Sequence, residues 1–225
     1  SAAGDLLPDV YFEKVDNSWE LLSYENSISF ADNPLVHKRH NLQGPIDDAF
    51  MESFVCVRGT GDAWAKEYQA RADATLNLFE KEFDKWLRGR VRIINDDQLT
   101  DEHIADSNLI LFGDPGSNAV MSRVIDRLPV RWTKDSFEIN GHSYETKTHT
   151  LSMIYPNPLN RRRYIVINSG HTMHEKDFRA SNSWLFPKQG DIAVQKYPAG
   201  ANDPTGATTV WAEMFDSNWK LAVQN

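Results

Sequence analysis

The chain has 225 residues, 40% of them hydrophobic and 25% charged, which is typical of a globular protein long enough to bury a core. Its 24 basic and 32 acidic residues give a formal net charge of −8, which argues against nucleic acid or anionic membrane as the main partner. No run of about 18 apolar residues is present, so we predict no membrane span.

The first 40 residues predict a β hairpin with a connecting segment. Residues 10–15 and 18–24 are β-like runs, separated by an Asp-Asn pair that is typical of a two-residue turn. The polar stretch that follows is interpreted as a connection over the surface. We therefore divide the chain into residues 1–40, the hairpin and its connection, and residues 41–225, an α/β domain.

From residue 54 the pattern changes to an alternation of strands and helices. Residues 54–58 are a compact strand candidate that contains Cys56, the only cysteine, so no intrachain disulfide can form. Cysteine inside an apolar strand usually behaves as a small buried hydrophobe, and we predict that role rather than a nucleophile.

A long helix is predicted after this strand. Apolar residues recur at every third or fourth position over about seven turns, which makes one stripe for packing against a core. Asp62 is expected to cap the start of the helix, and Gly89 to end it. The stripe comprises Trp64, Tyr68, Ala72, Leu76, Phe79, Phe83, Trp86 and Leu87.

Further strands are predicted at residues 91–94, 108–112 and 163–167, and the second of these is apolar throughout, as in a buried parallel sheet. The basic run of residues 161–163 is interpreted as a solvated corner. The alternation predicts an α/β fold, a Rossmann-like or flavodoxin-like three-layer sandwich with a mixed sheet, preceded by the hairpin.

The last third of the chain predicts short strands. Asn140 and Gly141 form the strongest hairpin signal, between two runs of strand-forming residues. Residues 190–196 and 208–215 are predicted as late strands.

Polar residues gather where the predicted strands end. Ligands in open α/β sheets bind beyond the carboxyl ends of the parallel strands, and these turns share one edge if the four strands are parallel. The candidate ligand-binding residues are Arg58, Thr60, Asp96, Asp114, Ser117, Asn118, Asn168, Ser169, His171 and His174.

The first of these turns, Arg-Gly-Thr-Gly at residues 58–61, resembles part of a dinucleotide fingerprint. That fingerprint needs a third small residue, where this chain has Trp64, and an acid about 20 residues further on. The candidate acid, Asp96, lies 37 positions after Gly59. We therefore predict no nucleotide cofactor.

No catalytic residue is assigned from the sequence. The nearest match to a nucleophile elbow, residues 141–145, lacks the final glycine and lies in a predicted hairpin rather than between a strand and a helix. His171, His174 and Glu175 would share a helix face, but their spacing is not a standard zinc pattern. We prefer a helix capped by Thr172 with Glu175 completing a capping box, and we predict no metal site.

Four stretches carry a resemblance to a known family. They are KRHNLQGPIDDAFMESFVCVRGTG, NLILFGDPGSNAVMSRVIDRLPVRW, MIYPNPLNRRRYIVINSGHTMHEKDF and the late GDIAV. Together they resemble a C-terminal region of bacterial multidomain α/β-hydrolases of the prolyl-oligopeptidase and acetylxylan-esterase-like type. The resemblance covers about residues 36–198.

The resemblance implies an accessory domain of a secreted or periplasmic serine esterase or peptidase. Its partner would be the N-terminal α/β-hydrolase catalytic domain of the same protein, which carries the nucleophile. The accessory domain would pack on that domain or assist substrate binding, with polysaccharide as the candidate substrate. Trp184 and Trp211 are the surface candidates for stacking on sugars.

Two alternatives stay open. A self-sufficient hydrolase would use Asp96, Asp114 and His171 at the strand-end edge, and would need all three within hydrogen-bond reach of a common point. A protein-interaction module would instead expose an apolar patch, for which the hairpin of residues 10–24 is the expected place.

Overall fold

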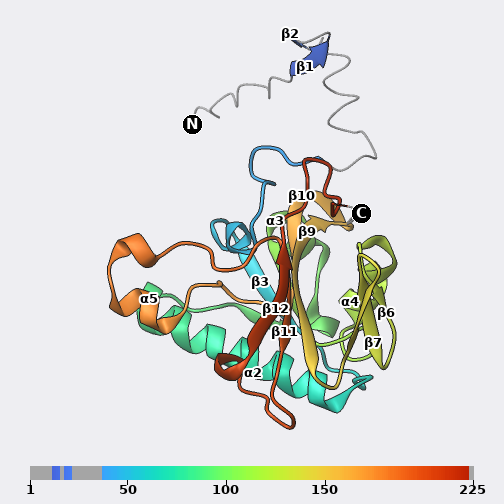
Figure 1. Cartoon of the computed structure of the whole chain (residues 1–225), viewed down its shortest axis with the longest axis vertical. Coiled ribbons are helices and arrows are strands. Elements are labelled where there is room, and N and C mark those ends of the chain that lie inside the picture. The colour runs from blue at the N-terminus through green and yellow to red at the C-terminus, as the bar shows by residue number, and fades with distance from the viewer. Residues whose placement is uncertain (1–11, 16–17, 22–36, 223–225) are drawn as a thin grey trace. The chain divides into compact units, whose positions relative to one another are not determined.

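Residues 12–15, 18–21 and 37–222 are described here, from a computed structural model of the chain (Figure 1). The chain divides into two units, Ser1–Val36 and His37–Asn225, which we treat separately. In the first unit, strand β1 (Phe12–Val15) pairs antiparallel with β2 (Ser18–Leu21). This pairing confirms the predicted hairpin, whose outer residues lie outside the described part of the chain, as does most of the connecting segment.

The second unit is built on a mixed seven-stranded sheet, as predicted. The order is β12-β11-β9-β10-β5-β3-β4, and the last four strands, β10-β5-β3-β4, are mutually parallel while β9, β11 and β12 pair antiparallel. The strands are β3 (Phe54–Arg58), β4 (Ile93–Asn95), β5 (Asn108–Phe112), β9 (His149–Asn157), β10 (Asn160–Ile167), β11 (Ile192–Lys196) and β12 (Thr208–Glu213). The strand predicted at residues 91–94 is therefore shifted, since it is observed as β4. The late strands predicted at residues 190–196 and 208–215 are observed as β11 and β12, and both are shorter than predicted.

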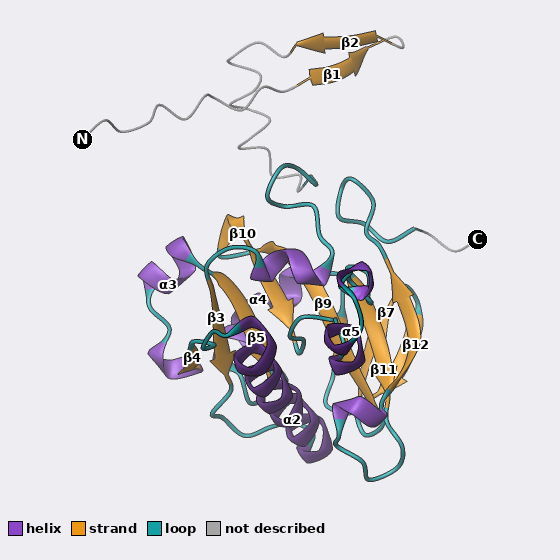
Figure 2. Cartoon of the chain, turned by 90° about the vertical axis from the view of Figure 1, so that its left-hand side faces the viewer, coloured by secondary structure: helices purple, strands orange, loops and turns teal. Residues whose placement is uncertain are grey.

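Two outer layers cover this sheet, which makes the predicted three-layer sandwich. Helices α2 and α5 lie on one face, and α4 with a small three-stranded sheet lies on the other (Figures 1 and 2). The helices are α2 (Lys66–Glu82), α3 (Asp101–Asp106), α4 (Ala119–Val124) and α5 (Glu175–Arg179). The small sheet comprises β6 (Arg131–Trp132), β7 (Ser136–Ile139) and β8 (His142–Glu145), and the predicted Asn-Gly turn joins the last two.

Short helical turns complete the chain. They are η1 (Ile46–Phe50), η2 (Phe83–Leu87), η3 (Asp96–Gln98), η4 (Ile125–Arg127), η5 (Asn182–Trp184) and η6 (Pro204–Gly206). Among the described residues no helix combines the length and apolar character that crossing a membrane requires.

The long helix differs from the prediction at both ends. It begins at Lys66, and its first turn is not capped by Asp62, because the backbone N–H of Ala65 donates to the Asp114 carboxylate instead (3.1 Å). Its α-helical part stops at Glu82, and a π-helical turn carries the chain to Arg88, whose φ of 58° is left-handed. A contact from a distant loop therefore sets the start of the helix.

The apolar stripe is buried only in the middle of the helix. Tyr68, Ala72, Leu76 and Phe79 are in the core, whereas Trp64 is 37% exposed, Trp86 is half-buried and Leu87 is 47% exposed. Our assumption that Trp64 and Trp86 are core residues is therefore wrong. The last residues of the stripe lie on the π-helical turn, where Trp86 stacks on Phe178 (5.5 Å between ring centroids).

The parallel strands form the core. Cys56 has no exposed surface and is flanked by Val55 and Val57, which are also fully buried. Burial raises the pKa of the Cys56 thiol, so the side chain stays neutral and behaves as the predicted hydrophobe.

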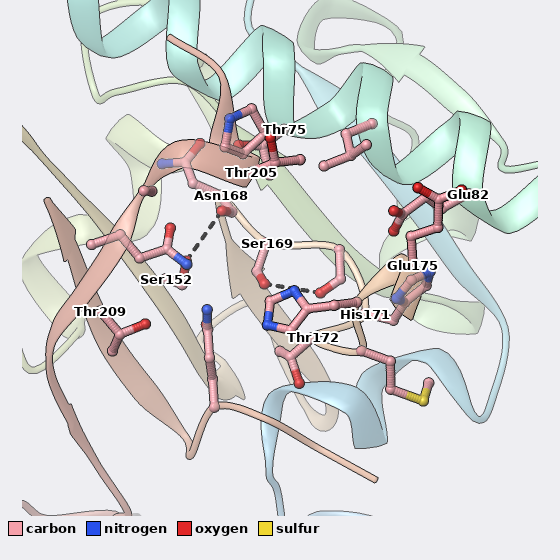
Figure 3. A pocket seen from close by; sticks show the side chains of 18 of the residues that line it. Thr75, Glu82, Ser152, Asn168, Ser169, His171, Thr172, Glu175, Thr205 and Thr209 are labelled. Carbon is pink, nitrogen blue, oxygen red and sulfur yellow. Dashed lines mark hydrogen bonds between the residues drawn. The ribbon is translucent and has the colours of Figure 1, made fainter. Parts of the chain in front are cut away.

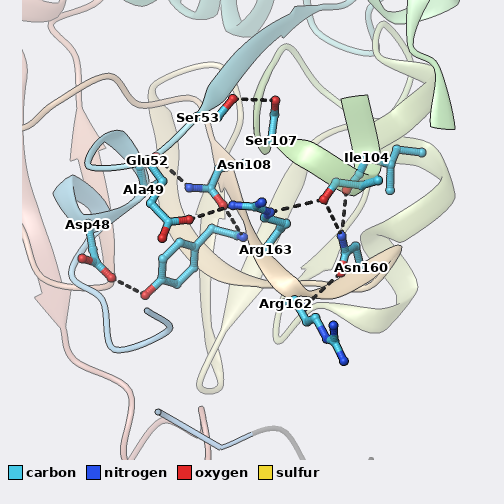
Figure 4. A network of polar contacts seen from close by, with 12 residues as sticks. Asp48, Ala49, Glu52, Ser53, Ile104, Ser107, Asn108, Asn160, Arg162 and Arg163 are labelled. Carbon is cyan, nitrogen blue, oxygen red and sulfur yellow. Dashed lines mark hydrogen bonds and ion pairs between the residues drawn. The ribbon is translucent and has the colours of Figure 1, made fainter. Parts of the chain in front are cut away.

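Polar side chains tie the strands together at their amino ends (Figure 4). Asn108 donates to the carbonyl of Ala49 (2.9 Å) and accepts from the backbone N–H of Tyr164 (2.9 Å). Arg163 forms an ion pair with Glu52 (2.7 Å), so only part of the basic run is the solvated corner that we predicted. Side-chain contacts therefore link the strands at this end of the sheet.

The buried carboxylate of Asp191 binds groups from near both ends of the second unit. Lys38 Nζ lies 2.5 Å from the carboxylate of Asp191, which has no exposed surface. The backbone N–H of Phe215 donates to the same carboxylate oxygen (2.8 Å), and Lys38 also lies over the ring of Trp219. Burial raises the pKa of Asp191, and the Lys38 ammonium opposes that shift.

The two glycines after β3 are required by a close backbone approach. A Cβ on Gly59 would lie 2.7 Å from the carbonyl oxygen of Ser117, and one on Gly61 would lie 2.9 Å from that of Gly116. Both neighbours are backbone atoms of the turn after β5, which cannot move aside cheaply. These glycines therefore serve loop packing, which agrees with the absence of a nucleotide fingerprint.

We expect Gly59→Ala to lower the free energy of unfolding by about 1–3 kcal/mol, because the added methyl group overlaps the Ser117 carbonyl. Gly206→Ala is the matched control, since a Cβ there meets nothing within 4 Å. Urea unfolding of both variants measures the difference. Equal stabilities would contradict a packing role for Gly59.

Candidate functional site

The predicted strand-end edge exists, because β3, β4, β5 and β10 are parallel. The turn after β3 packs directly on the turn after β5. The backbone N–H of Gly59 donates to Phe112 O (3.1 Å), and that of Gly61 donates to Ser117 O (2.8 Å). The candidate residues of these turns are therefore brought together as expected.

Asp114 is fully engaged by backbone donors. One carboxylate oxygen accepts the N–H groups of Gly116 and Ser117, each at 2.9 Å, and the other accepts that of Ala65 at 3.1 Å. The side chain is 1% exposed. Asp114 thus holds its own turn and the start of α2, and its oxygens face N–H groups instead of solvent.

Asp96 has a similar role beside the start of α4. One of its oxygens accepts the hydroxyl of Thr60 (2.7 Å), and the other accepts the backbone N–H of Ala119 (2.7 Å). Arg58, which is exposed, donates to the side chain of Asn95 (2.9 Å). These contacts hold the turn after β4 against its neighbours.

Asn118 and Asn168 complete the set of loop-binding side chains. The Asn118 amide nitrogen donates to Val57 O and Phe112 O, and its oxygen accepts the first N–H groups of α4. The Asn168 side chain makes two bonds to the backbone of Gly113 and donates to Tyr68 Oη. Both amides are buried and saturated by the protein itself.

An open cavity lies elsewhere, on the α2 face of β9, β11 and β12 (Figure 3). Its volume is about 740 Å³, within the range of about 300–1,000 Å³ that is usual for small-molecule sites. Its lining is rich in neutral hydrogen-bonding side chains, which include Thr75, Ser152, Gln189, Gln195, Thr205 and Thr209.

The cavity takes in four of the ten sequence-predicted site residues. Asn168, Ser169, His171 and His174 are part of its lining. The other six, Arg58, Thr60, Asp96, Asp114, Ser117 and Asn118, are not. The enzyme alternative needed Asp96 and Asp114 to share a pocket with His171, and neither carboxylate lines the cavity that His171 lines.

His171 is held between two aromatic rings. Its ring lies edge-on to Phe79 (5.4 Å between centroids) and to Phe178 (5.5 Å). Both ring nitrogens are buried, and neither makes a hydrogen bond of normal geometry within the described residues. Burial lowers the pKa of His171, while the nearby charge of Asp47 acts in the opposite direction.

The segment after His171 is not capped as predicted. Thr172 binds the carboxylate of Asp47 through its backbone N–H (2.7 Å) and its hydroxyl, and the hydroxyl also accepts the N–H of Lys188. Helix α5 begins only after His174, whose N–H donates to Asp177 (2.9 Å). The predicted Thr172–Glu175 capping box is therefore wrong, because a residue far away in the sequence already occupies Thr172.

Glu175 lies at the rim of the cavity and is paired with Lys85 (2.6 Å) and Arg179 (2.8 Å). Those two cations lower the pKa of the Glu175 carboxyl. Within residues 37–222 no group of three or more His, Cys, Asp or Glu side chains is placed to hold a metal ion.

Several cavity residues were missed from the sequence. Ser152, Gln195 and Thr209 come from three different strands and meet only through antiparallel pairing. The only available signal was a polar residue in each otherwise apolar strand, such as Ser152 in the run Thr-Leu-Ser-Met-Ile.

Comparison of the chain with protein-family models, with curated proteins and with solved structures finds no match.

The lowered pKa of His171 predicts a pH effect on stability. Above about pH 6.5 the ring is neutral in both states, and below that value the unfolded chain binds the proton more readily than the folded one. We therefore expect the protein to lose stability as pH falls from about 6.5, by at most about 1.4 kcal/mol per pH unit from this group.

His171→Phe keeps the ring packing and removes this titration, so its stability should fall less steeply over the same interval. His142→Phe, which replaces an exposed histidine on β8, is the control and should retain the slope of the unsubstituted chain. Urea unfolding at pH 7.5, 6.5 and 5.5 makes the comparison. Parallel curves for all three proteins would contradict the proposed burial of a neutral His171.

Proposed function

We propose that this chain is a non-catalytic accessory domain of a secreted or periplasmic serine hydrolase, an esterase or a peptidase. It packs on the catalytic domain or assists substrate binding. One observation carries the proposal. The carboxylates of Asp96 and Asp114, the acids of the strand-end edge, are each taken up by protein N–H or O–H donors.

This observation bears on catalysis because a general acid or base needs a free position for the reacting proton. Each carboxylate already accepts three hydrogen bonds from the protein and neither lines the cavity, so neither is placed to exchange a proton with a substrate there. A serine nucleophile also needs a base within hydrogen-bond reach. Ser169 lies two positions before His171 in the cavity lining, and its hydroxyl donates to Gly170 O (2.9 Å) instead of to a histidine.

The hydrolase context comes from the resemblance of residues 36–198, and the hairpin supports packing on a partner. Trp19 and Leu21 of β2 are 69% and 65% exposed. They are two positions apart on one strand, so they lie on the same face. Exposed apolar side chains on one face suit a docking surface for the catalytic domain.

The absence of an independent active site is tested with aryl acetates such as 4-nitrophenyl acetate. We expect the chain to hydrolyse them no faster than the buffer does, and His171→Ala and Ser169→Ala to behave in the same way. Turnover well above the buffer rate that His171→Ala abolishes would overturn the non-catalytic part of the proposal.

The hydrolase context is tested separately, on the gene. We expect the reading frame upstream of Ser1 to encode an α/β-hydrolase domain with a G-x-S-x-G nucleophile elbow. A reading frame that starts near Ser1, or an upstream domain of another class, would overturn this part.

A further inference from the structure

The floor of the cavity is a polar patch on an otherwise apolar sheet. Ser152, Gln195 and Thr209 line it from β9, β11 and β12, and Gln195 lies directly opposite Thr209 in the strand register. Leu151 and Val194 beside them are fully buried. Ser152 donates its hydroxyl to Asn168 O (3.3 Å) and Gln195 Oε1 accepts from Thr150 (3.5 Å), so the amide nitrogen of Gln195 and the hydroxyl of the exposed Thr209 are the floor groups that can serve a ligand.

Polar atoms of the lining residues are also left without partners. Both nitrogens of His171 and the Oε1 atom of Gln189 are buried without a hydrogen bond in the described part of the chain. A buried polar group without a partner costs about 1–3 kcal/mol. These atoms are enclosed by the protein, so they mark a loosely hydrogen-bonded cavity wall, and a ligand would pair with the side chains that line the open space.

The charges around the cavity do not favour an ionic ligand. Lys81 and Lys176 are accompanied by Glu82, Glu175 and Asp203 in the lining, and Glu175 is already paired with two cations outside it. A phosphate site would need converging cations or backbone N–H groups, and a cation site would need converging free carboxylates. Neither arrangement is present in the lining.

Apolar lining completes the chemistry. Leu78 comes from α2, and Met173 and Pro204 come from the loops on either side. Such side chains suit the C–H faces of a sugar ring, while the floor residues suit its hydroxyl groups. A hydroxyl both donates and accepts, which matches the side-chain amide of Gln195 and the hydroxyl of Thr209.

We propose that this cavity binds a neutral saccharide, of about monosaccharide to disaccharide size, with Gln195 and Thr209 as hydrogen-bonding partners. The proposal deepens the function above, because it names the substrate class that the accessory domain would hold for the hydrolase. The sugar is either a free oligosaccharide or the end of a polysaccharide chain, since both present the same hydroxyl groups.

The test is a titration of the isotopically labelled chain followed by heteronuclear NMR. The probes are xylobiose, cellobiose, xylohexaose and, as charged comparisons, glucuronic acid and glucose 6-phosphate. We expect at least one neutral sugar to shift the amide signals of Ser152, Gln195 and Thr209, and to bind at least about tenfold more tightly than either charged probe, a difference of about 1.4 kcal/mol. If xylohexaose binds as tightly as xylobiose, the site accepts the end of a polysaccharide chain. If affinity is lost as the sugar becomes longer, the site accepts a free oligosaccharide.

Variants tie the binding to the cavity. Gln195→Leu and Thr209→Val should each weaken sugar binding about tenfold, the loss expected for one hydrogen bond. Thr208→Val is the matched control, since Thr208 is the neighbouring residue of β12 and is not part of the lining, and it should bind as the unsubstituted chain does. Thermal unfolding of each variant verifies that it is folded.

Three results would overturn the saccharide site: no shift with any neutral sugar, tighter binding of a charged probe, or binding that Gln195→Leu and Thr209→Val leave unchanged. None of these bears on the hydrolysis assay or on the upstream gene, so failure of the site is distinguishable from failure of the accessory function.

Discussion

Three backbone N–H groups converge on the carboxylate of Asp114, and the parallel half of the domain depends on that contact. It fixes the turn after β5 through Gly116 and Ser117, and it fixes the start of α2 through Ala65. Because a buried carboxylate is costly unless it is hydrogen-bonded, the turn after β5 and the start of α2 stabilise each other through this side chain. The same turn explains the two glycines after β3. Its backbone lies so close to Gly59 and Gly61 that neither position has room for a side chain.

The distribution of polar groups gives the two halves of the sheet different roles. At the carboxyl ends of the parallel strands, where open α/β sheets usually bind ligands, the side chains are used to hold loops together. In the antiparallel half, polar side chains of β9, β11 and β12 line an open cavity on the face toward α2. His171 lies where the two halves meet, just after the last parallel strand, which explains why it lines the cavity although Asp96 and Asp114 do not.

Sequence patterns predicted the elements whose signal is local. The apolar run of residues 108–112 and the Asn-Gly turn at residue 140 need no knowledge of distant residues, and both are confirmed. The helix start and the α5 cap were wrong because Asp114 and Asp47, remote in the sequence, bind the groups that local capping would have used. The cavity was unpredictable for a related reason, since its floor exists only once three antiparallel strands are in register.

The ion pair between Lys38 and Asp191 has a consequence for how the domain can be excised. Asp191 is enclosed, and Lys38, Phe215 and Trp219 together surround it from both ends of the polypeptide. Deleting the residues up to and including Lys38 would leave the buried carboxylate of Asp191 without its counter-ion. That state costs far more free energy than the loss of a few surface residues. The shortest fragment that folds on its own therefore begins upstream of Lys38 and ends beyond Trp219, a boundary that neither strand assignments nor the hairpin would have indicated.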